Sequence, residues 1–376
     1  MYDLDLLKKL ISIPSFVEGK VDEAQIGEFV YNFLKEVPFL KVQKQSISKT
    51  RFNVVATDGK PTKLLLYGHL DTVTPRSHNL RDQFKPTIVG DKLYGLGVVD
   101  MKAGLAAILS AIKNSQPTNG LTAFFSCDEE YEFLGTKKFL KEFKLNPKLI
   151  LSAEATDQLI SNGCRGALEC TFTLEGTTAH SSTPQLGQNA IEGVMKLVSD
   201  LKGVLGKFGN KEVGRTTANL AYLNGGLLAS RSENRIIARA NSVPDMAQVL
   251  LELRIADKKL TPSWLEKTLT QLARKDGLKI THFKTHFCVN PYLTPGNKLR
   301  SLESSLLRVG LEPVYQNISQ VGYYDTQLLQ ESWKVPTASF GPGPKTSAHR
   351  SNEYVSVKSF LSVIKVYQQV IKDFCA

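Results

Sequence analysis

Cysteine is scarce in this sequence and follows no pattern. Among 376 residues there are five cysteines, Cys127, Cys164, Cys170, Cys288 and Cys375, and none forms a C-x-x-C pair. An odd number of scattered cysteines excludes a disulfide framework of the kind that stabilises small secreted domains. We therefore expect reduced, buried thiols in a cytoplasmic protein.

Long apolar runs are also missing. No stretch approaches the ~18 uninterrupted apolar residues that a membrane-spanning helix needs. The start, MYDLDLLKKLISIPS, has two acidic residues before its lysines and no long apolar core, unlike a signal peptide. We expect no membrane association, and we find no internal repeat or low-complexity tract.

The net charge is +11, but the sequence lacks a concentrated basic segment. The lysines are spread along the chain, and no basic run is interleaved with aromatic residues, which argues against a nucleic-acid-binding protein. A basic surface can equally attract small anionic substrates.

Short apolar runs that end in polar residues are what the sequence does contain. KLLLYGHLDTV (63–73), LTAFFSCDEE (121–130) and KLILSAEA (148–155) predict buried strands, and DMKAGLAAILSAIKNS (100–115) has helical periodicity. Strands that alternate with helices predict an α/β fold, with a mostly parallel sheet flanked by helices. Ligands bind at the carboxyl ends of such strands, where the acidic residues fall.

The pattern changes after residue 163. Alternating strands are predicted around 167–176, 216–226, 246–255 and 278–287, with amphipathic helices at 189–203 and 262–277. This βαββαβ order predicts a ferredoxin-like α+β domain, an antiparallel sheet with two helices on one face. The α/β pattern returns from about 291. We therefore predict a discontinuous domain, 1–163 plus 291–376, with an inserted domain at 164–290.

His69 and Asp71 stand at the end of the first buried strand. Residues i and i+2 of a strand point to the same side, so the two side chains lie together. A carboxylate beside a histidine fixes the ring tautomer and improves the ring as a metal ligand. A buried histidine that is satisfied by a neighbouring acid is the alternative.

Four further segments place potential ligands at strand ends or helix starts: Asp100, the run Asp128–Glu129–Glu130, Glu154 and His349. Taken singly, Asp100 fits a helix N-cap and the acidic run fits a solvated loop. Together with His69 they bring two histidines and at least three carboxylates to one predicted sheet edge. That set suits zinc or another divalent transition metal, and the carboxylates suffice for two ions.

The segments GHLDTV, GLGVVDMKAG, DEEYEFLGT, EGTTAHSSTPQLGQNAI and FGPG…AHRSNEYV resemble, in order and approximate spacing, those of the M20 metallopeptidase family. The family includes acetylornithine deacetylase and succinyl-diaminopimelate desuccinylase, and the resemblance covers essentially the whole chain. It implies a zinc-exopeptidase-like catalytic domain and an inserted domain that acts as a lid and in dimerisation.

The resemblance also implies two Zn²⁺ ions, for which Co²⁺ or Mn²⁺ are possible substitutes. One ion would be held by His69 and Glu154, and the other by Glu130 and His349. Asp100 would bridge the two.

Further roles follow from the same resemblance. Asp71 would brace His69, Glu129 would act as the general base, and the peptide bond after Asp100 would be cis. His180 would donate to the developing oxyanion, often in the site of the partner subunit of a homodimer formed through the inserted domain. A loop histidine is the alternative for His180.

Three residues are candidate substrate contacts. Asn241 and Arg254 match positions that contact the polar end of the substrate, and an arginine can clamp a carboxylate. Arg254 could instead be a solvated strand residue. Tyr323, in QVGYYDTQLL, stands where desuccinylases have a small residue, which argues against that activity.

We therefore expect a dinuclear zinc amidohydrolase that removes an acyl group from an N-acyl amino acid, like acetylornithine deacetylase. The alternative within the family is a carboxypeptidase or dipeptidase that cleaves short peptides beside a free carboxylate. A non-catalytic basic protein that keeps the fold is a third possibility, but such a protein has no need for clustered buried acids. Leu96 and Ala155, where the family commonly has arginine and proline, weaken assignment to one subfamily.

Overall fold

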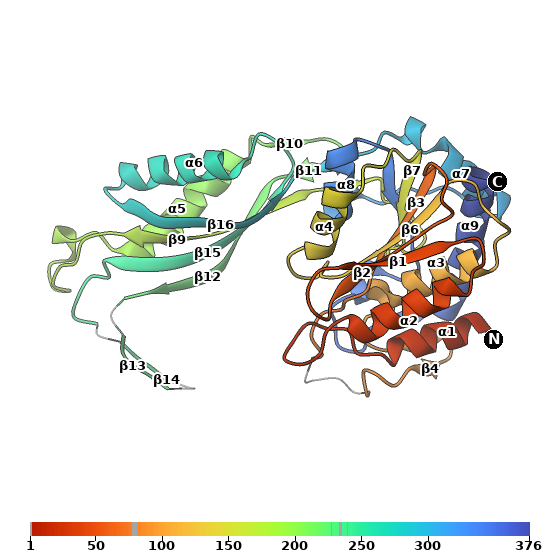
Figure 1. Cartoon of the computed structure of the whole chain (residues 1–376). Helices are drawn as coiled ribbons and strands as arrows, with labels where there is room; N and C mark the ends of the chain where they lie inside the picture. The colour runs from red at the N-terminus through yellow and green to blue at the C-terminus, as the bar shows by residue number, and fades with distance from the viewer. Residues whose placement is uncertain (1, 77–80, 227, 233–234, 239) are drawn as a thin grey trace. The chain divides into compact units, whose positions relative to one another are not determined.

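The computed structural model describes residues 2–76, 81–226, 228–232, 235–238 and 240–376. These residues form two compact units (Figure 1). The first consists of Met1–Gly163, Leu293–Asn317 and Tyr324–Ala376, and the second of Cys164–Tyr292 and Ile318–Tyr323. No helix in the described part of the chain has both the length and the apolar character needed to cross a membrane.

A six-stranded sheet forms the centre of the first unit. Its spatial order is β1 (Lys41–Ser46), β2 (Phe52–Thr57), β6 (Leu121–Ser126), β3 (Leu64–His69), β7 (Leu149–Ser152) and β18 (Thr337–Ser339). The last four strands in this order are parallel to one another, whereas β1 and β2 are antiparallel. This arrangement confirms the predicted mostly parallel sheet.

The strand register places the predicted site at the carboxyl-terminal ends of the parallel strands. His69, the last residue of β3, pairs with Ser126, the last residue of β6, and Tyr67 pairs with Ser152 at the end of β7. Every residue of β3, β6 and β7 is buried, because helices cover both faces of the sheet. The polar residues that follow these strands therefore leave the core at neighbouring points.

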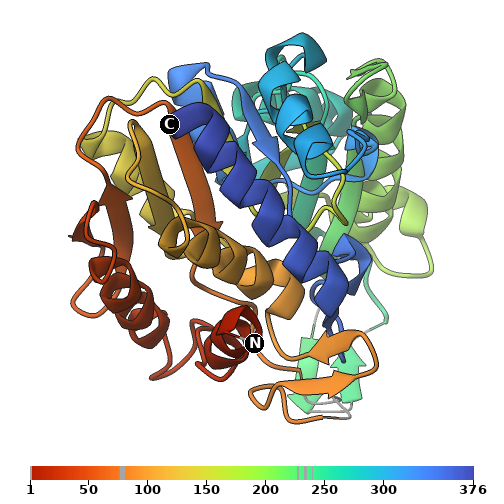
Figure 2. The ribbon, with the colours of Figure 1, turned by 90° about the vertical axis from the view of Figure 1, so that its right-hand side faces the viewer.

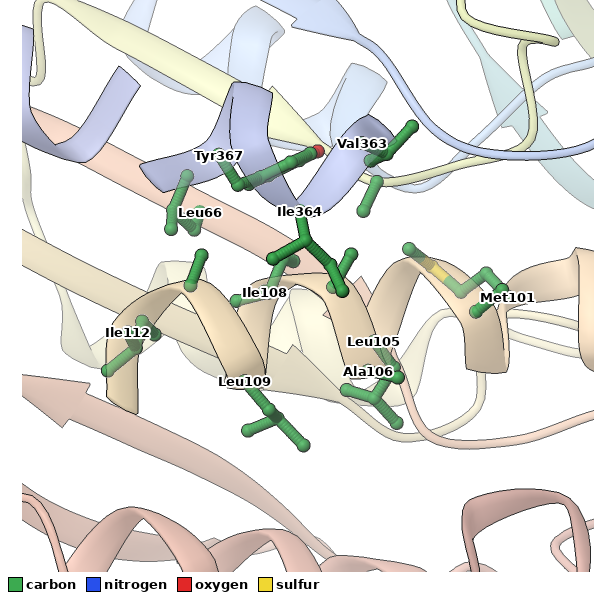
Figure 3. Packing of buried hydrophobic residues seen from close by; sticks show 14 of the residues in the cluster. Leu66, Met101, Leu105, Ala106, Ile108, Leu109, Ile112, Val363, Ile364 and Tyr367 are labelled. Carbon is green, nitrogen blue, oxygen red and sulfur yellow. The ribbon is translucent and has the colours of Figure 1, made fainter. Parts of the chain in front are cut away.

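Helices on one face pack against alternate strand residues such as Leu64 and Leu66. They are α1 (Tyr2–Ile11), α2 (Ala24–Lys35), α3 (Ala103–Lys113), α7 (Arg300–Arg308) and α9 (Val357–Cys375). Helices α3 and α9 run side by side across the sheet (Figure 2). Between them, Ile108 and Ile364 pack over Leu66, as Figure 3 shows.

The opposite face is covered by α4 (Leu134–Glu142) and α8 (Thr326–Trp333). Phe139 of α4 and Leu329 of α8 pack there with the strand residues Leu65 and Tyr67. A small sheet of β4 (Thr87–Val89), β5 (Lys92–Tyr94) and β19 (Tyr354–Ser356) completes the first unit.

The second unit has the βαββαβ order expected from the sequence. The spatial strand order is β12 (Thr217–Gly225), β15 (Met246–Ile255), β9 (Gly166–Glu175) and β16 (Lys279–Val289), with all neighbours antiparallel. Helices α5 (Ala190–Leu205) and α6 (Pro262–Lys275) pack on this sheet in one hydrophobic core. Both begin at side-chain caps, Asn189 for α5 and Thr261 for α6.

Several short elements were not anticipated. They are β8 (Gly163–Cys164), β17 (Tyr292–Leu293), β10 (Gly209–Asn210) with β11 (Gly214–Arg215), and the hairpin of β13 (Leu228–Ser232) and β14 (Arg235–Ala238). The segment Ile318–Tyr323 belongs to the second unit, although its position in the sequence placed it in the first domain. Its assignment follows from packing, since the Tyr323 ring lies 5.5 Å from that of Phe287, centroid to centroid.

Helix α3 approaches the end of β7 so closely that only glycine fits at position 104. A Cβ atom there would lie 2.1 Å from the carbonyl oxygen of Ala153. Gly104→Ala is therefore expected to destabilise the protein by about 1–3 kcal/mol, the usual cost of overpacking. Chemical denaturation of the purified variant measures this cost.

Gly203→Ala is the matched control, because Gly203 is also helical and a Cβ atom there would have no neighbour within 4 Å. It is expected to leave stability unchanged or raise it by about 0.5–1 kcal/mol. A Gly104→Ala variant as stable as the wild type would contradict the close contact.

Candidate metal centre

His69 is held at the end of β3 with one ring nitrogen facing a cluster of carboxylates. Its Nδ1 atom lies 3.0 Å from the carbonyl oxygen of Asp71, to which it can donate. Its Nε2 atom lies 3.1 Å from Oδ1 of Asp100 and 3.5 Å from Oε1 of Glu154. In the neutral ring this arrangement leaves the Nε2 lone pair facing the cluster.

The Asp71 carboxylate has a different contact from the one expected. It lies 3.6 Å from Nδ1 of His69, beyond hydrogen-bonding distance. It instead accepts hydrogen bonds from the backbone N–H groups of Glu129, at 3.1 Å, and Glu130, at 2.8 Å. The main chain of Asp71 thus orients the histidine, while its side chain holds the loop after β6.

Asp100 lies in a tight turn, Val98–Lys102, that leads into α3. The Asp100–Met101 peptide bond is cis, which confirms the expectation from the family resemblance. Helix α3 begins at Ala103 and has no side-chain cap, so Asp100 is not its N-cap. The two Asp100 oxygens face different histidines: Oδ1 faces His69, and Oδ2 lies 3.3 Å from Nε2 of His349.

His349 and Glu130 form the other half of the cluster. Nε2 of His349 lies 3.0 Å from Oε1 of Glu130. Two sets of three potential ligands therefore share Asp100: His69–Asp100–Glu154 and Asp100–Glu130–His349. Within each set the ligand atoms lie within 4.8 Å of one another, as they do in a third set, His69–Glu129–Glu130.

The pKa values of two carboxyl groups in the cluster are raised, so a bound cation would be needed to keep both groups ionised at neutral pH. Burial and the charge of Asp100 raise the pKa of Glu154 to about 8. Burial, together with the charges of Glu154, Asp325 and Glu130, raises the pKa of Glu129 well above its ordinary value, against the opposing charge of His69. These carboxyl groups would otherwise retain protons at neutral pH.

The pKa values of the two histidines are raised as well, which for imidazole favours the charged form. Hydrogen bonds to Asp100 and Glu130 raise the pKa of His349 to about 10. Burial opposes protonation of His69, but hydrogen bonding to Asp100 and the surrounding carboxylate charges outweigh burial and raise its pKa.

The donor set therefore fits divalent cations. Imidazole nitrogens and carboxylate oxygens are the ligands that zinc takes together, and a cation would neutralise the buried acids. In addition, Oε1 of Glu154 is buried and accepts no hydrogen bond from the residues that the structure describes. A metal ion is a suitable partner for that atom.

Two supporting residues, Glu353 and Lys102, lie in segments that resemble the family but are not among the predicted site residues. The Glu353 carboxylate is buried and accepts from the backbone N–H groups of Gly97, Val99 and Asp100, at 3.0, 2.6 and 3.1 Å. Lys102 is buried as well and donates to the carbonyl oxygen of Ile13 at 2.7 Å. In the sequence, each is a charged residue directly before an apolar helix or a strand, and this position was the only local indication of a buried charge.

The remaining candidates lie in the second unit and form two pairs. The N–H of Ser182 donates to Nδ1 of His180 at 3.2 Å, so the neutral His180 ring carries its proton on Nε2. Close by, the N–H of Ser181 donates to the carbonyl oxygen of Asn241 at 3.1 Å. His180 is exposed, and in the neutral ring its Nε2–H is free to donate a hydrogen bond to a ligand.

Arg254 and Tyr323 are the second pair. The Arg254 guanidinium stacks on the Tyr323 ring at 4.5 Å and pairs with Glu252 at 2.9 Å. With its side chain 31% exposed, Arg254 is neither a freely solvated strand residue nor a fully buried one.

Known proteins resemble this chain over nearly its whole length. The model of the peptidase family M20/M25/M40 matches residues 65–373. An acetylornithine deacetylase from Buchnera aphidicola subsp. Schizaphis graminum is 29% identical, over 99% of this chain and 98% of the relative.

Solved structures share the fold. Aminopeptidase PepT from Bacillus cereus superimposes with a TM-score of 0.77 at 19% identity, covering 99% of this chain and 98% of the other. A dinuclear metal-binding peptidase of the M20 family from Bacillus subtilis has a TM-score of 0.70 at 13% identity, covering 98% and 96%.

Proposed function

Because this chain belongs to the peptidase family M20/M25/M40, whose members hydrolyse amide or peptide bonds, we propose that it is a dinuclear metal-dependent deacylase of N-acyl amino acids. The observation that carries the substrate class is the similarity to acetylornithine deacetylase, which extends over 99% of the chain. The proposed substrate is a small molecule with an N-acyl group and a free carboxylate.

We assign the metal ligands from the two oxygens of Asp100, one of which faces His69 and the other His349. His69 and Glu154 would hold one ion, Glu130 and His349 the other, and Asp100 would bind both. Zinc suits two imidazoles and three carboxylates, with Co²⁺ or Mn²⁺ as substitutes. When bound, such ions polarise the amide carbonyl and lower the pKa of water.

Glu129 is the proposed general base. Its backbone N–H is bound by Asp71, and its carboxylate lies close to His69 and Glu130. Each of the two proposed ions has three ligands without Glu129. It would take a proton from the attacking water and deliver that proton to the nitrogen of the leaving amine. Such transfers contribute typically about 10²–10⁴-fold to rate.

Residues of the second unit would recognise the substrate. In the neutral ring, the Nε2–H of His180 is a donor suited to a developing oxyanion. Arg254 is suited to the substrate carboxylate, with Asn241 and Tyr323 as further contacts. We also propose that the protein is cytoplasmic, in keeping with its free cysteines, and that it forms a homodimer through the second unit.

Hydrolysis assays with zinc- or cobalt-loaded protein test the function. N-acetylornithine and other N-acetyl amino acids are expected to be hydrolysed, and chelation is expected to remove activity that added zinc or cobalt restores. The panel should include N-succinyl-diaminopimelate, N-formyl amino acids and dipeptides. Faster hydrolysis of dipeptides than of every acyl amino acid would replace the deacylase with a peptidase, and no hydrolysis at all would refute the proposal.

A further inference from the structure

The loop after β6 is held by side chains from elsewhere in the first unit. The backbone N–H groups of residues 127–130 donate in chain order to Asn53, Glu23 and, twice, Asp71, at 3.0, 2.9, 3.1 and 2.8 Å. We call residues 127–130 the base loop, because Glu129 and Glu130 belong to it. Its backbone position is thus set residue by residue through side-chain acceptors.

Asp128 forms the turn of the base loop. Its φ of 71° lies in the left-handed region, which aspartate tolerates better than most residues. One carboxylate oxygen, Oδ2, accepts from the N–H groups of Glu132, at 3.0 Å, and Leu134, at 3.2 Å. The Asp128 side chain therefore supports the turn into α4, and it is absent from the groups of potential metal ligands in the described chain.

The other oxygen of Asp128, Oδ1, is bound by Arg51. The same guanidinium donates to both oxygens of Glu23, from Nε at 2.8 Å and from Nη2 at 2.7 Å. The side chains of Arg51, Glu23 and Asp128 are only 15%, 1% and 3% exposed. A single planar cation thus joins two buried carboxylates and binds Glu23 through two donors at once, a geometry that the ammonium group of a lysine does not reproduce.

We propose that Arg51 and Glu23 are positioning residues that set the turn at Asp128 and so direct Glu129 and Glu130 toward metal and substrate. The proposal rests on the functions proposed above for Glu129 and Glu130. Both positioning residues precede residue 65, where the match to the family model begins, so membership in the family does not assign them a role.

The physical reason is the geometry with which the guanidinium binds two carboxylates beside one backbone bond. Without the guanidinium fork, the Glu23 and Asp128 carboxylates would face each other in a buried site and repel. Glu23 accepts the N–H of Asp128, so separating the two carboxylates moves the turn itself. Glu129 and Glu130 follow directly in the chain and would be displaced with it.

Arg51→Lys tests this role, because it keeps the charge and removes the fork. Zinc affinity is measured on metal-depleted protein by competition with a chelator, without substrate. We expect affinity to fall by about 10–100-fold, the usual effect of losing a residue that orients a metal ligand. In assays at saturating zinc, kcat is expected to fall by a similar factor while KM changes less than about twofold.

Arg308→Lys is the matched control, since Arg308 pairs with Asp373 in the same unit, far along the chain from the base loop. It is expected to leave zinc affinity and kcat unchanged. Glu23→Gln serves as the second variant, which carries the same prediction if Arg51→Lys does not fold. Thermal unfolding of each variant separates a general loss of stability from a loss of affinity.

Zinc affinity and kcat within about twofold of wild type in the folded variants would overturn the positioning role, even if the melting temperature fell. Because affinity is measured without substrate, this result is independent of the hydrolysis assays. A wild-type protein that binds zinc but hydrolyses no substrate refutes the proposed function alone, whereas one that binds no zinc refutes both.

Discussion

Glu129→Ala is expected to reduce kcat by about 10³-fold while both metal ions stay bound, which is the loss typical of removing a general base. The side chain is buried beside His69, and its backbone N–H remains bound to Asp71 in the variant. The substitution should therefore remove a proton acceptor without moving the loop. Steady-state kinetics and metal analysis of the same preparation measure the two quantities.

Glu132→Ala is the matched control for this variant. Glu132 lies three residues further along the same loop, and its side chain is exposed. Normal activity is expected. Loss of metal from Glu129→Ala would instead assign Glu129 as a ligand, in line with its presence in the third group, His69–Glu129–Glu130.

Asp100→Ala is expected to leave less than one ion per chain after dialysis and to abolish activity. Its two oxygens face His69 and His349, so a single substitution removes a ligand from both proposed metal positions. The proposed ligand set would then contain two carboxylates and two histidines in place of three carboxylates and two histidines. Metal analysis after dialysis against metal-free buffer measures the loss.

Asp100→Asn separates charge from geometry, because it keeps one oxygen and the side-chain shape. Intermediate metal retention is expected. Asp5→Ala, at an exposed side chain of α1, is the control and should keep the wild-type metal content. Retention of both ions by Asp100→Ala, with normal activity, would exclude a bridging role for Asp100.

The parallel sheet and the segments of the site could be predicted because their signals are local. Buried strands between two helical layers have short apolar runs, as in 64–68, 123–125 and 149–151. A carboxylate or imidazole directly after such a run stands out against it. Parallel register then brings His69 and the residues after Ser126 and Ser152 to one edge.

The acidic run 128–130 shows where such reasoning stops. The sequence presents three equivalent carboxylates in a row. In the structure Asp128 turns away to pair with Arg51, whereas Glu129 and Glu130 lie in the cluster. The left-handed backbone conformation of Asp128 turns its side chain away from those of Glu129 and Glu130. No pattern of residue types indicates which of the three acids will adopt that conformation.

The sequence by itself determined the class of fold, the family and the segments that could supply metal ligands, because periodicity and strand-end polarity are properties of neighbouring residues. Only the tertiary structure decided which atoms meet. Arg51 binds an aspartate 77 positions away, and Glu353 accepts the N–H of Gly97 across 256 positions. Such contacts depend on how whole elements pack, so the sequence does not indicate which backbone groups these side chains bind.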